Sequence, residues 1–379
     1  MKIFGAGIMA FTGFLCFCGY AFAEGIDLGP CKLYPVIKTE GRYESNIFQM
    51  SSNTKSELVN TITPEILFKF KLSGDNVFDI SYKYEMINFD RYSSDNRRNN
   101  KFNANLELYG SSYFFKLKER YDEVTSTYTY AEYFDDYVQN EAFISTGREF
   151  NDISFELFYE NLDYEYNNID SVNSRNDHVF DIAGFYNILP KTKALAEYSF
   201  TKINYDNSSA KDGMANEFLV GVQGELAQKI TGTVKAGYQS RNYDGYTDWK
   251  EPVTYANIVY EASEKTLLDA MAERKPLESI DTAQNFYESN IVGFGIRHDV
   301  TAKTATYLKL KYNFDRYPAT NTDSVRREDD IWNAKIGLDI NSRQWLDIGA
   351  NYEFQKRNSN ISSNDYENNI TSIYLKAMY

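Results

Sequence analysis

The last twelve residues of the chain, Asn368 to Tyr379 (NNITSIYLKAMY), decide the fold. Apolar and polar side chains alternate along them with a period of two, which is typical of a β-strand with two unlike faces. A barrel in which this strand pairs with the first strand leaves no exposed edge. We therefore predict an outer-membrane β-barrel whose terminal signal for the barrel-assembly machinery consists of Ile373, Leu375, Ala377 and Tyr379.

The composition agrees with a barrel that has a wet interior, because every second barrel residue can face water. Beyond the N-terminus the 379-residue chain contains no apolar run of about 18 residues, so no spanning helix is expected. The formal net charge of −14 argues against a nucleic-acid partner. Three cysteines and two histidines leave little material for a metal cluster, and we expect no metal and no cofactor.

The N-terminal part divides into a targeting segment and a short lead-in. Residues 1–23 have the charged start, apolar middle and small-x-small end of a secretory signal peptide. Cleavage before Glu24 leaves Cys31 as the single thiol of an exported protein. We expect residues 24–36 to form an irregular periplasmic segment and residues 37–379 to form the barrel.

The lengths of the connections between the alternating segments indicate the topology of the barrel. They are short and long in turn; residues 72–75 are an example of a short one, and residues 90–100 and 122–136 are examples of long ones. Membrane barrels have short periplasmic turns and long extracellular loops. The pattern predicts a single all-β, antiparallel transmembrane barrel of about 18 strands in the outer membrane of a Gram-negative bacterium, wide enough for an aqueous interior.

Two segments fit this pattern less well. Pro64 lies inside the second strand and cannot donate a ladder hydrogen bond, so we expect a β-bulge there. Residues 265–279 alternate poorly, and part of this segment resembles a short helix. The strand count and the alternation of the connections favour a strand.

The lumen face contains the candidate functional residues. Three cations, Lys116, Lys118 and Arg120, recur at every second position and would climb one wall. They either attract an anionic solute or pair with Glu107 and neighbouring carboxylates to hold the wall together. The other candidate pore-lining residues are a smaller cationic pair and three tyrosines on which sugar rings could stack: Lys309, Lys311, Tyr109, Tyr255 and Tyr307.

Other polar residues have an ordinary explanation beside a functional one. His178 and His298 are expected at opposite rims, and no nucleophile–base pair can be named, so we predict no catalytic residues and no enzyme activity. The acidic runs 135–136 and 328–330 could bind calcium on outer loops, but solvated acidic loops are more common.

Several short motifs resemble the putative beta-barrel porin 2 family, which occurs among exopolysaccharide-export outer-membrane proteins. They are distributed over nearly the whole mature chain: Tyr43–Phe48, Ser263–Thr266 with Arg274 and Glu278–Ser279, Ile296–Thr301, and Tyr352 through Arg357–Asn360 to Asp365–Asn368. The resemblance implies an 18-stranded barrel without catalytic residues that often works beside a periplasmic polysaccharide-export protein.

Three functions therefore stand open. The barrel is an exopolysaccharide-export conduit, a general diffusion porin, or a structural or adhesive surface barrel. The expected partners are outer-membrane lipid, the barrel-assembly machinery and, for the conduit, a periplasmic polysaccharide-export protein and its polysaccharide.

Overall fold

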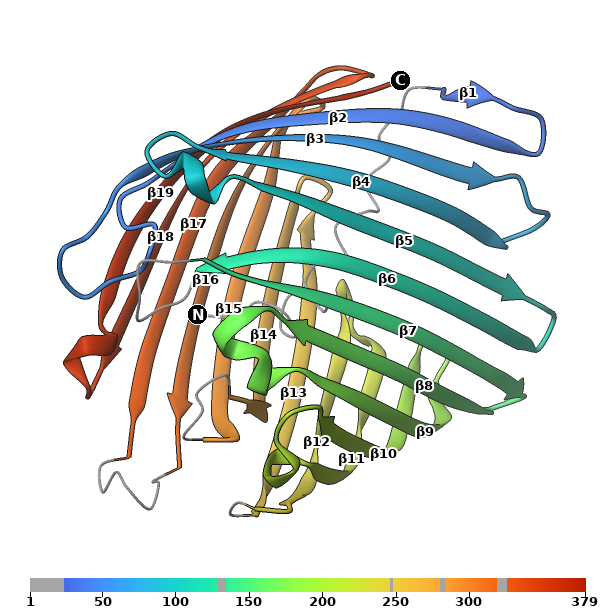
Figure 1. The fold of residues 1–379 in the computed structure, drawn as a ribbon. Coiled ribbons are helices and arrows are strands. Elements are labelled where there is room, and N and C mark those ends of the chain that lie inside the picture. Colours follow the sequence, from blue (N-terminus) through green and yellow to red (C-terminus); the bar gives the residue numbers. More distant parts are fainter. Residues whose placement is uncertain (1–23, 128–133, 246–247, 280–283, 319–325) are drawn as a thin grey trace.

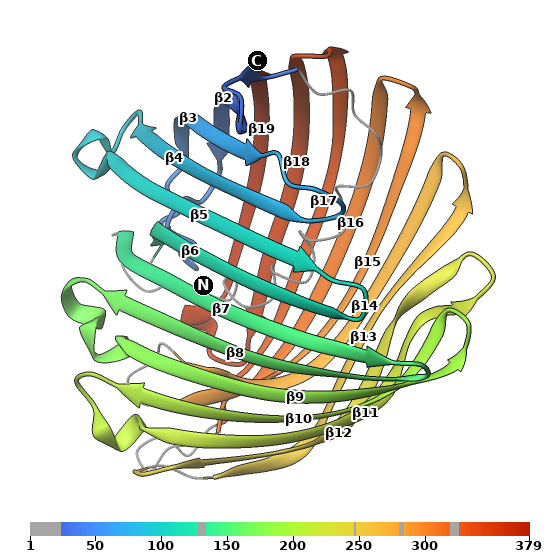
Figure 2. The ribbon, with the colours of Figure 1, turned by 90° about the vertical axis from the view of Figure 1, so that its right-hand side faces the viewer.

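Eighteen antiparallel strands, β2 to β19, close into one barrel in the computed structural model, which describes residues 24–127, 134–245, 248–279, 284–318 and 326–379. Each strand pairs with its neighbours in sequence, and β19 pairs with β2 to complete the ring (Figures 1 and 2). The predicted fold class, strand count and alternation of short and long connections are confirmed.

The barrel strands β2 to β19 are 13 to 17 residues long, β1 has two residues, and four short 3-10 helices lie in the described parts of the connections. The strands are β1 (Ile26–Asp27), β2 (Cys31–Glu44), β3 (Glu57–Phe70), β4 (Val77–Phe89), β5 (Arg97–Tyr109), β6 (Tyr113–Thr127), β7 (Phe134–Phe150), β8 (Ile153–Tyr166), β9 (Arg175–Leu189), β10 (Thr192–Tyr205), β11 (Gly213–Ala227), β12 (Ile230–Tyr243), β13 (Trp249–Ser263), β14 (Thr266–Glu278), β15 (Phe286–Thr301), β16 (Thr304–Arg316), β17 (Glu328–Arg343), β18 (Leu346–Ser359) and β19 (Tyr366–Met378). The 3-10 helices are η1 (Ser93–Asp95), η2 (Asn168–Asn173), η3 (Ser209–Lys211) and η4 (Ser362–Asn364).

Several strands extend beyond the apolar segments that predicted them. The first barrel strand begins at Cys31, so residues 31–36, expected as irregular lead-in, belong to the barrel wall. Strand β6 continues to Thr127 and β7 begins at Phe134, so much of the expected loop 122–136 is strand. Ladder hydrogen bonds join backbone groups and need no apolar side chain, so pairing continues past the part of the wall that faces lipid.

The two irregular segments have different outcomes. Residues 265–279 contain strand β14, as the strand count favoured. The bulge expected at Pro64 is wrong, because Pro64 pairs in register with Ile37 and the β3–β4 register is the same on both sides of it. Pairing of β3 with β4 is simply interrupted at Thr63 and Pro64. Because proline has no backbone N–H, the β3–β4 hydrogen bonds are missing at this point, but the register of the two strands does not change.

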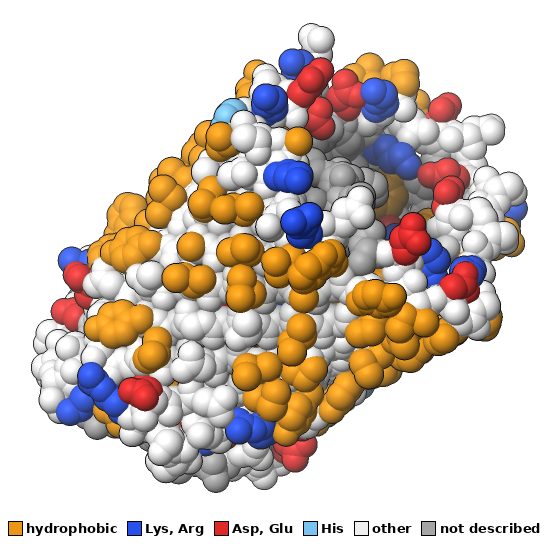
Figure 3. Space-filling view, turned by 90° about the horizontal axis from the view of Figure 1, so that it is seen from above, with side chains coloured by type: hydrophobic (Ala, Val, Ile, Leu, Met, Phe, Trp, Pro, Cys, Tyr) orange, Lys and Arg blue, Asp and Glu red, His pale blue; other side chains and the backbone are white. Residues whose placement is uncertain are grey.

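The outer wall is apolar and carries tyrosines that bond across neighbouring strands. Residues such as Ile182, Phe218 and Ile336 are about half exposed on this face, where they meet lipid. On the outer face, tyrosine hydroxyls near the middle of three strands donate to an amide oxygen near the start of the following strand: Tyr82 to Asn100, Tyr198 to Asn216 and Tyr352 to Asn369. Figure 3 shows hydrophobic side chains over the outer wall and charged side chains around a hollow.

Among the helices of the described residues, none has the length and the hydropathy of a membrane-spanning helix.

The seam between the last and first strands is tied at its extracellular end by buried amides. The Asn368 side chain, fully buried, accepts the Asn46 backbone N–H at 3.0 Å and donates to Glu44 Oε2 at 2.9 Å. The Asn46 amide in turn donates to the backbone oxygens of Met50 and Glu367. The opening motif 43–48 and the closing motif 365–368, which suggested the family resemblance, thus meet at one clasp.

The periplasmic end of the same seam is extended by β1. Strand β19 covers β2 only from Glu44 to Val36, and the Tyr379 backbone N–H then donates to the Pro35 oxygen at 3.1 Å. Beyond that point β1 pairs with Lys32 and Leu33 on the same edge of β2. The beginning of β1 therefore continues the line of β19, and Figure 1 shows the C-terminus beside it.

Candidate functional site

The β6 cation ladder, defined as Lys116, Lys118 and Arg120, lies on the lumen face of the wall. Its residues alternate with Leu117, which is exposed on the outer face. In register, Lys116 stands opposite Glu107 on β5, and Arg120 stands opposite Glu141 on β7. The ladder is therefore bordered by a carboxylate on each flanking strand.

The contacts of the ladder are partly electrostatic and partly aromatic. Lys118 Nζ lies 3.8 Å from Glu107 Oε1, and Arg120 Nη2 lies 2.5 Å from Asp122 Oδ2. Lys116 Nζ instead lies 5.9 Å from the centre of the Tyr109 ring. The side chains of Lys118 and Arg120 remain 48% and 40% exposed. The ladder is thus paired with carboxylates and still accessible to a solute in the lumen.

Lysine–tyrosine pairs recur around the inner wall: besides Lys69 with Tyr34 near the periplasmic end and Lys211 with Tyr205 near the extracellular end, four lie along the wall between them. In each pair a lysine Nζ lies within 6 Å of the centre of a tyrosine ring, which is the range of a cation–π contact. These four pairs, with their distances, are Lys116 and Tyr109 (5.9 Å), Lys235 and Tyr255 (5.5 Å), Lys309 and Tyr307 (5.8 Å), and Lys38 and Tyr374 (5.2 Å). All three tyrosines expected from the sequence are among them.

Three of these rings are held in place. The Tyr109 hydroxyl donates to Glu107 at 2.5 Å, and the Tyr374 hydroxyl donates to Asp339 at 2.8 Å. The Tyr307 ring extends across Gly337 on the neighbouring strand, where a Cβ atom would have no room. Each of these three rings is therefore fixed relative to the wall. A solute that contacts it does not have to order the ring, so less conformational entropy is lost.

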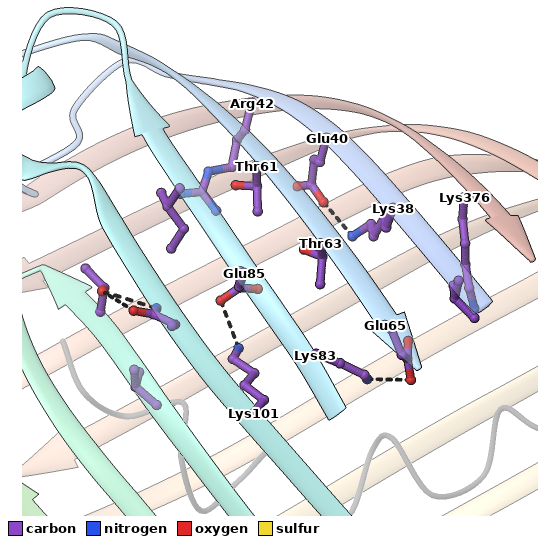
Figure 4. A pocket seen from close by; sticks show the side chains of 15 residues that line it. Lys38, Glu40, Arg42, Thr61, Thr63, Glu65, Lys83, Glu85, Lys101 and Lys376 are labelled. Atoms are coloured by element: carbon purple, nitrogen blue, oxygen red, sulfur yellow. Dashed lines mark hydrogen bonds and ion pairs between the residues drawn. The ribbon is translucent and has the colours of Figure 1, made fainter. Parts of the chain in front are cut away.

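A pocket of about 460 Å³ opens on the inner wall beside the closing seam (Figure 4). Three ion pairs cross its floor: Lys38 with Glu40 at 2.6 Å, Lys83 with Glu65 at 3.7 Å, and Lys101 with Glu85 at 3.1 Å. The remaining polar lining residues are Arg42, Thr61, Thr63, Asn99, Thr125 and Lys376. The volume lies in the range of small-molecule sites, while the lining is mostly polar and charged, with Val36, Ile87 and Val124 as its apolar residues.

The extracellular ends of the strands are lined by buried side chains that point inward. Arg241 pairs with Glu278, whose carboxylate also accepts the hydroxyls of Tyr205 at 2.8 Å and Tyr243 at 3.1 Å. Two further buried pairs of this kind are Arg175–Asp177 and Arg327–Asp329. These residues form an extracellular collar of aromatic and ion-paired groups above the open lumen wall.

The other sequence candidates lie apart from one another. His178 stands near the start of β9 and His298 near the end of β15, on the outer face at opposite ends of the barrel. They contact Tyr159 and Thr266, respectively. In the described part of the chain no group of three or more His, Cys, Asp or Glu side chains could hold a metal ion. Of the proposed calcium ligands, Asp136 binds Arg97 and Asp329 binds Arg327, while the side chain of Asp135 lies outside the described residues.

The remaining pore and assembly candidates fall on opposite faces. Lys309 and Lys311 lie on the lumen side of β16, alternating with the exposed Leu310. The proposed assembly residues Ile373 and Leu375 face outward and are 60% and 43% exposed, with Ala377 on the same face. Tyr379 follows β19 as the last residue.

The periplasmic β1 strand, which lies outside the membrane-spanning strands, has a solvent-exposed polar anchor at Asp27. Asp27 accepts hydrogen bonds from Lys71 at 2.7 Å and from the Gly29 backbone N–H at 2.8 Å. The Lys71 hydrogen bond, together with that of Gly29, lowers the pKa of Asp27. The anchor ties the N-terminal strand to the β3–β4 turn.

The pocket beside the seam was not predicted from the sequence. Its residues stand on polar faces that the alternation does reveal, since Lys38 and Lys376 both alternate with apolar neighbours. Their proximity depends on the register of the closing seam, which joins residues 338 positions apart. That register is set when the clasp and the β19–β2 backbone hydrogen bonds form, so it cannot be read from the sequence of a single strand.

A closed antiparallel barrel with an apolar outer wall and a charged lumen defines the class of outer-membrane porin-type channels. The family model described as Putative beta-barrel porin 2 matches residues 21–379, and the chain belongs to this family. The protein is therefore an outer-membrane β-barrel of the porin type, and the family resemblance of the sequence motifs is confirmed. No curated protein matches the chain.

Solved structures with the same fold are outer-membrane proteins of distant sequence. OpdK from Pseudomonas aeruginosa is 9% identical, with a TM-score of 0.50, and the match covers 92% of this chain and 99% of OpdK. OccAB3 from Acinetobacter baumannii is 10% identical, with a TM-score of 0.52 and coverage of 92% and 99%. OccAB4 from the same organism is 12% identical, with a TM-score of 0.52 and coverage of 92% and 98%. At these identities the likeness concerns the fold alone.

Proposed function

We propose that this porin-type barrel conducts a saccharide chain, an exopolysaccharide, from the periplasm to the cell surface. The lysine–tyrosine pairs in four sectors of the inner wall carry the proposal. A tyrosine ring offers a flat surface to the apolar face of a sugar, and the ammonium beside it donates to a hydroxyl or carboxylate. Repeated weak contacts favour passage, because a single tight site would trap the polymer.

The periplasmic side would receive the polymer from a periplasmic polysaccharide-export protein. The β6 cation ladder also favours passage of a polymer. Its accessible cations stand about 6–7 Å apart along the strand, which is twice the strand rise. An anionic polymer would meet one positive group after another along this wall. Carboxylates beside the ladder keep each contact weak.

The experiment that tests the proposal removes the rings. Tyr109, Tyr255, Tyr307 and Tyr374 are changed together to Leu, and a matched variant carries Phe at the same four positions. Saccharide oligomers should interrupt the ionic current of single wild-type and Phe-variant channels, and interrupt that of the Leu variant much less often. Equal interruption in the Leu and Phe variants would show that the rings only stabilise the wall.

A second candidate, a general diffusion porin, is favoured by the ion pairs on the pocket floor. The opposite charges cancel within each of the pairs Lys38–Glu40, Lys83–Glu65 and Lys101–Glu85, so these three pairs contribute little charge selectivity. Such a channel would pass small solutes of either charge, and the change of the four tyrosines to Leu would leave its current and its solute range unchanged.

A further inference from the structure

Two lysines face each other directly across the closing seam. Lys376 of β19 is the register partner of Lys38 of β2, and both line the pocket beside the seam. Figure 4 shows the two side chains on adjacent strands of the pocket wall. Register partners on one face have Cβ atoms about 5 Å apart, and like charges in that position destabilise a sheet.

Neighbouring carboxylates relieve this repulsion only in part. Lys38 Nζ is bound to Glu40 Oε2 at 2.6 Å. Lys376 interacts electrostatically with Asp347, its register partner on β18, but no ion pair or hydrogen bond at contact distance joins Lys376 to another described residue. Five cations and three carboxylates line the pocket, and because Arg42 is paired with Glu44 at 2.8 Å, Lys376 is the surplus cation. The wall therefore presents an excess of positive charge at an accessible position, with the Lys38 side chain 41% exposed.

The groups around the two lysines define a ligand. Thr61 and Thr63 point hydroxyls into the same pocket from β3, and the Tyr374 ring lies 5.2 Å from Lys38 Nζ. A carboxylate between the two ammonium groups would offset their repulsion, while ring hydroxyls would bond to the threonines. We propose that this pocket is a binding subsite for a sugar acid, a hexuronate unit carrying one carboxylate.

The inference deepens the proposed function, on which it rests, by naming the sugar unit that the lumen prefers. It also predicts an effect that transport alone would not produce. Because the pocket takes residues from β2, β3 and β19, a bound uronate would join the two closing strands. A ligand that binds the folded barrel and not the unfolded chain raises the midpoint of unfolding.

The experiment uses the full mature barrel in detergent micelles, where no transport occurs. The midpoint of heat-modifiable migration is measured with trigalacturonate, with the neutral trimer maltotriose, and with sodium sulfate at equal ionic strength. We expect trigalacturonate alone to raise the midpoint. Lys376→Gln should weaken trigalacturonate binding about tenfold or more, because a charge-assisted hydrogen bond is lost. Lys38→Gln is the second variant and should have the same effect.

Lys193→Gln is the matched control, because it removes one lumen-facing charge whose partner Glu149 is largely exposed. It should keep the trigalacturonate shift. Without ligand, Lys376→Gln should unfold at the wild-type temperature or above it, because a repulsive pair is removed, whereas a structural lysine would lower it.

Three results would overturn the subsite. They are an equal shift with maltotriose, an equal shift with sulfate, and an undiminished shift in Lys376→Gln. Because binding is measured in micelles without transport, loss of the uronate shift and failure of the four-tyrosine test are separate results, and the first can occur without the second.

Discussion

Replacing Asn368 by Ala tests whether the extracellular clasp holds the barrel closed. The Asn368 side chain is fully buried between the first and last strands, where it bonds the Asn46 backbone N–H and the Glu44 carboxylate. Alanine would leave both groups buried without this partner. An unsatisfied buried group costs about 1–3 kcal/mol, and because Glu44 keeps its ion pair with Arg42, the Asn46 N–H alone predicts a loss of about 1–3 kcal/mol in the free energy of unfolding. The β19–β2 ladder remains, so the barrel should still close.

The matched control for this variant is Asn369→Ala. Asn369 is the next residue on the same strand, but its side chain faces outward, and within the described part of the chain it accepts a hydrogen bond from the exposed Tyr352 hydroxyl alone, at 2.6 Å. Its loss should cost no more than about 1 kcal/mol. Urea unfolding in detergent and the midpoint of heat-modifiable migration measure both variants. If both substitutions lowered the stability equally, the claim that the buried Asn368 hydrogen bonds stabilise the closed seam would be refuted.

Three further predictions concern the lumen and the two chain ends. Changing the β6 cation ladder to Gln should leave folding intact, shift the reversal potential in a KCl gradient toward cation selectivity and reduce exported polymer; unchanged selectivity and polymer output would make the ladder structural. Tyr379→Asp should leave the protein in the periplasm, and normal yield in the outer-membrane fraction would argue against the terminal signal. The lowered pKa of Asp27 means that its contribution to docking of β1 is complete above the ordinary value of 3.8 and is lost as the pH falls through the lowered pKa; amide exchange of the β1–β2 hairpin should show this, and Asp27→Asn should abolish the pH dependence.

The architecture could be predicted because it depends on repeating local properties. Each strand shows the alternation of its own side chains, as in Ile373, Leu375 and Ala377, and each connection shows its own length. The ends of strands were less predictable, as the early start of β2 at Cys31 shows. Backbone pairing continues where the lipid-facing pattern has ended, so the side chains no longer mark the strand.

The candidate site was predictable only as far as single strands could reveal it. The β6 cation ladder and Tyr109 were visible because they belong to one strand or one hairpin. Lys38 and Lys376 become neighbours only through the register of the closing seam. Likewise, the roles of Asn46 and Asn368 required the two ends of the chain to be placed together. Non-local register is a property of the closed ring rather than of its segments.

The most direct test of the proposed function is the passage of a polymer through the barrel. Proteoliposomes that contain the mature protein are loaded with a fluorescent polyuronate and, separately, with glucose of matched osmolarity. A polysaccharide conduit should release both, and release of the polyuronate should fall when the four lumen tyrosines are changed to Leu. Release of glucose with complete retention of the polyuronate would contradict the conduit and identify the barrel as a general diffusion porin.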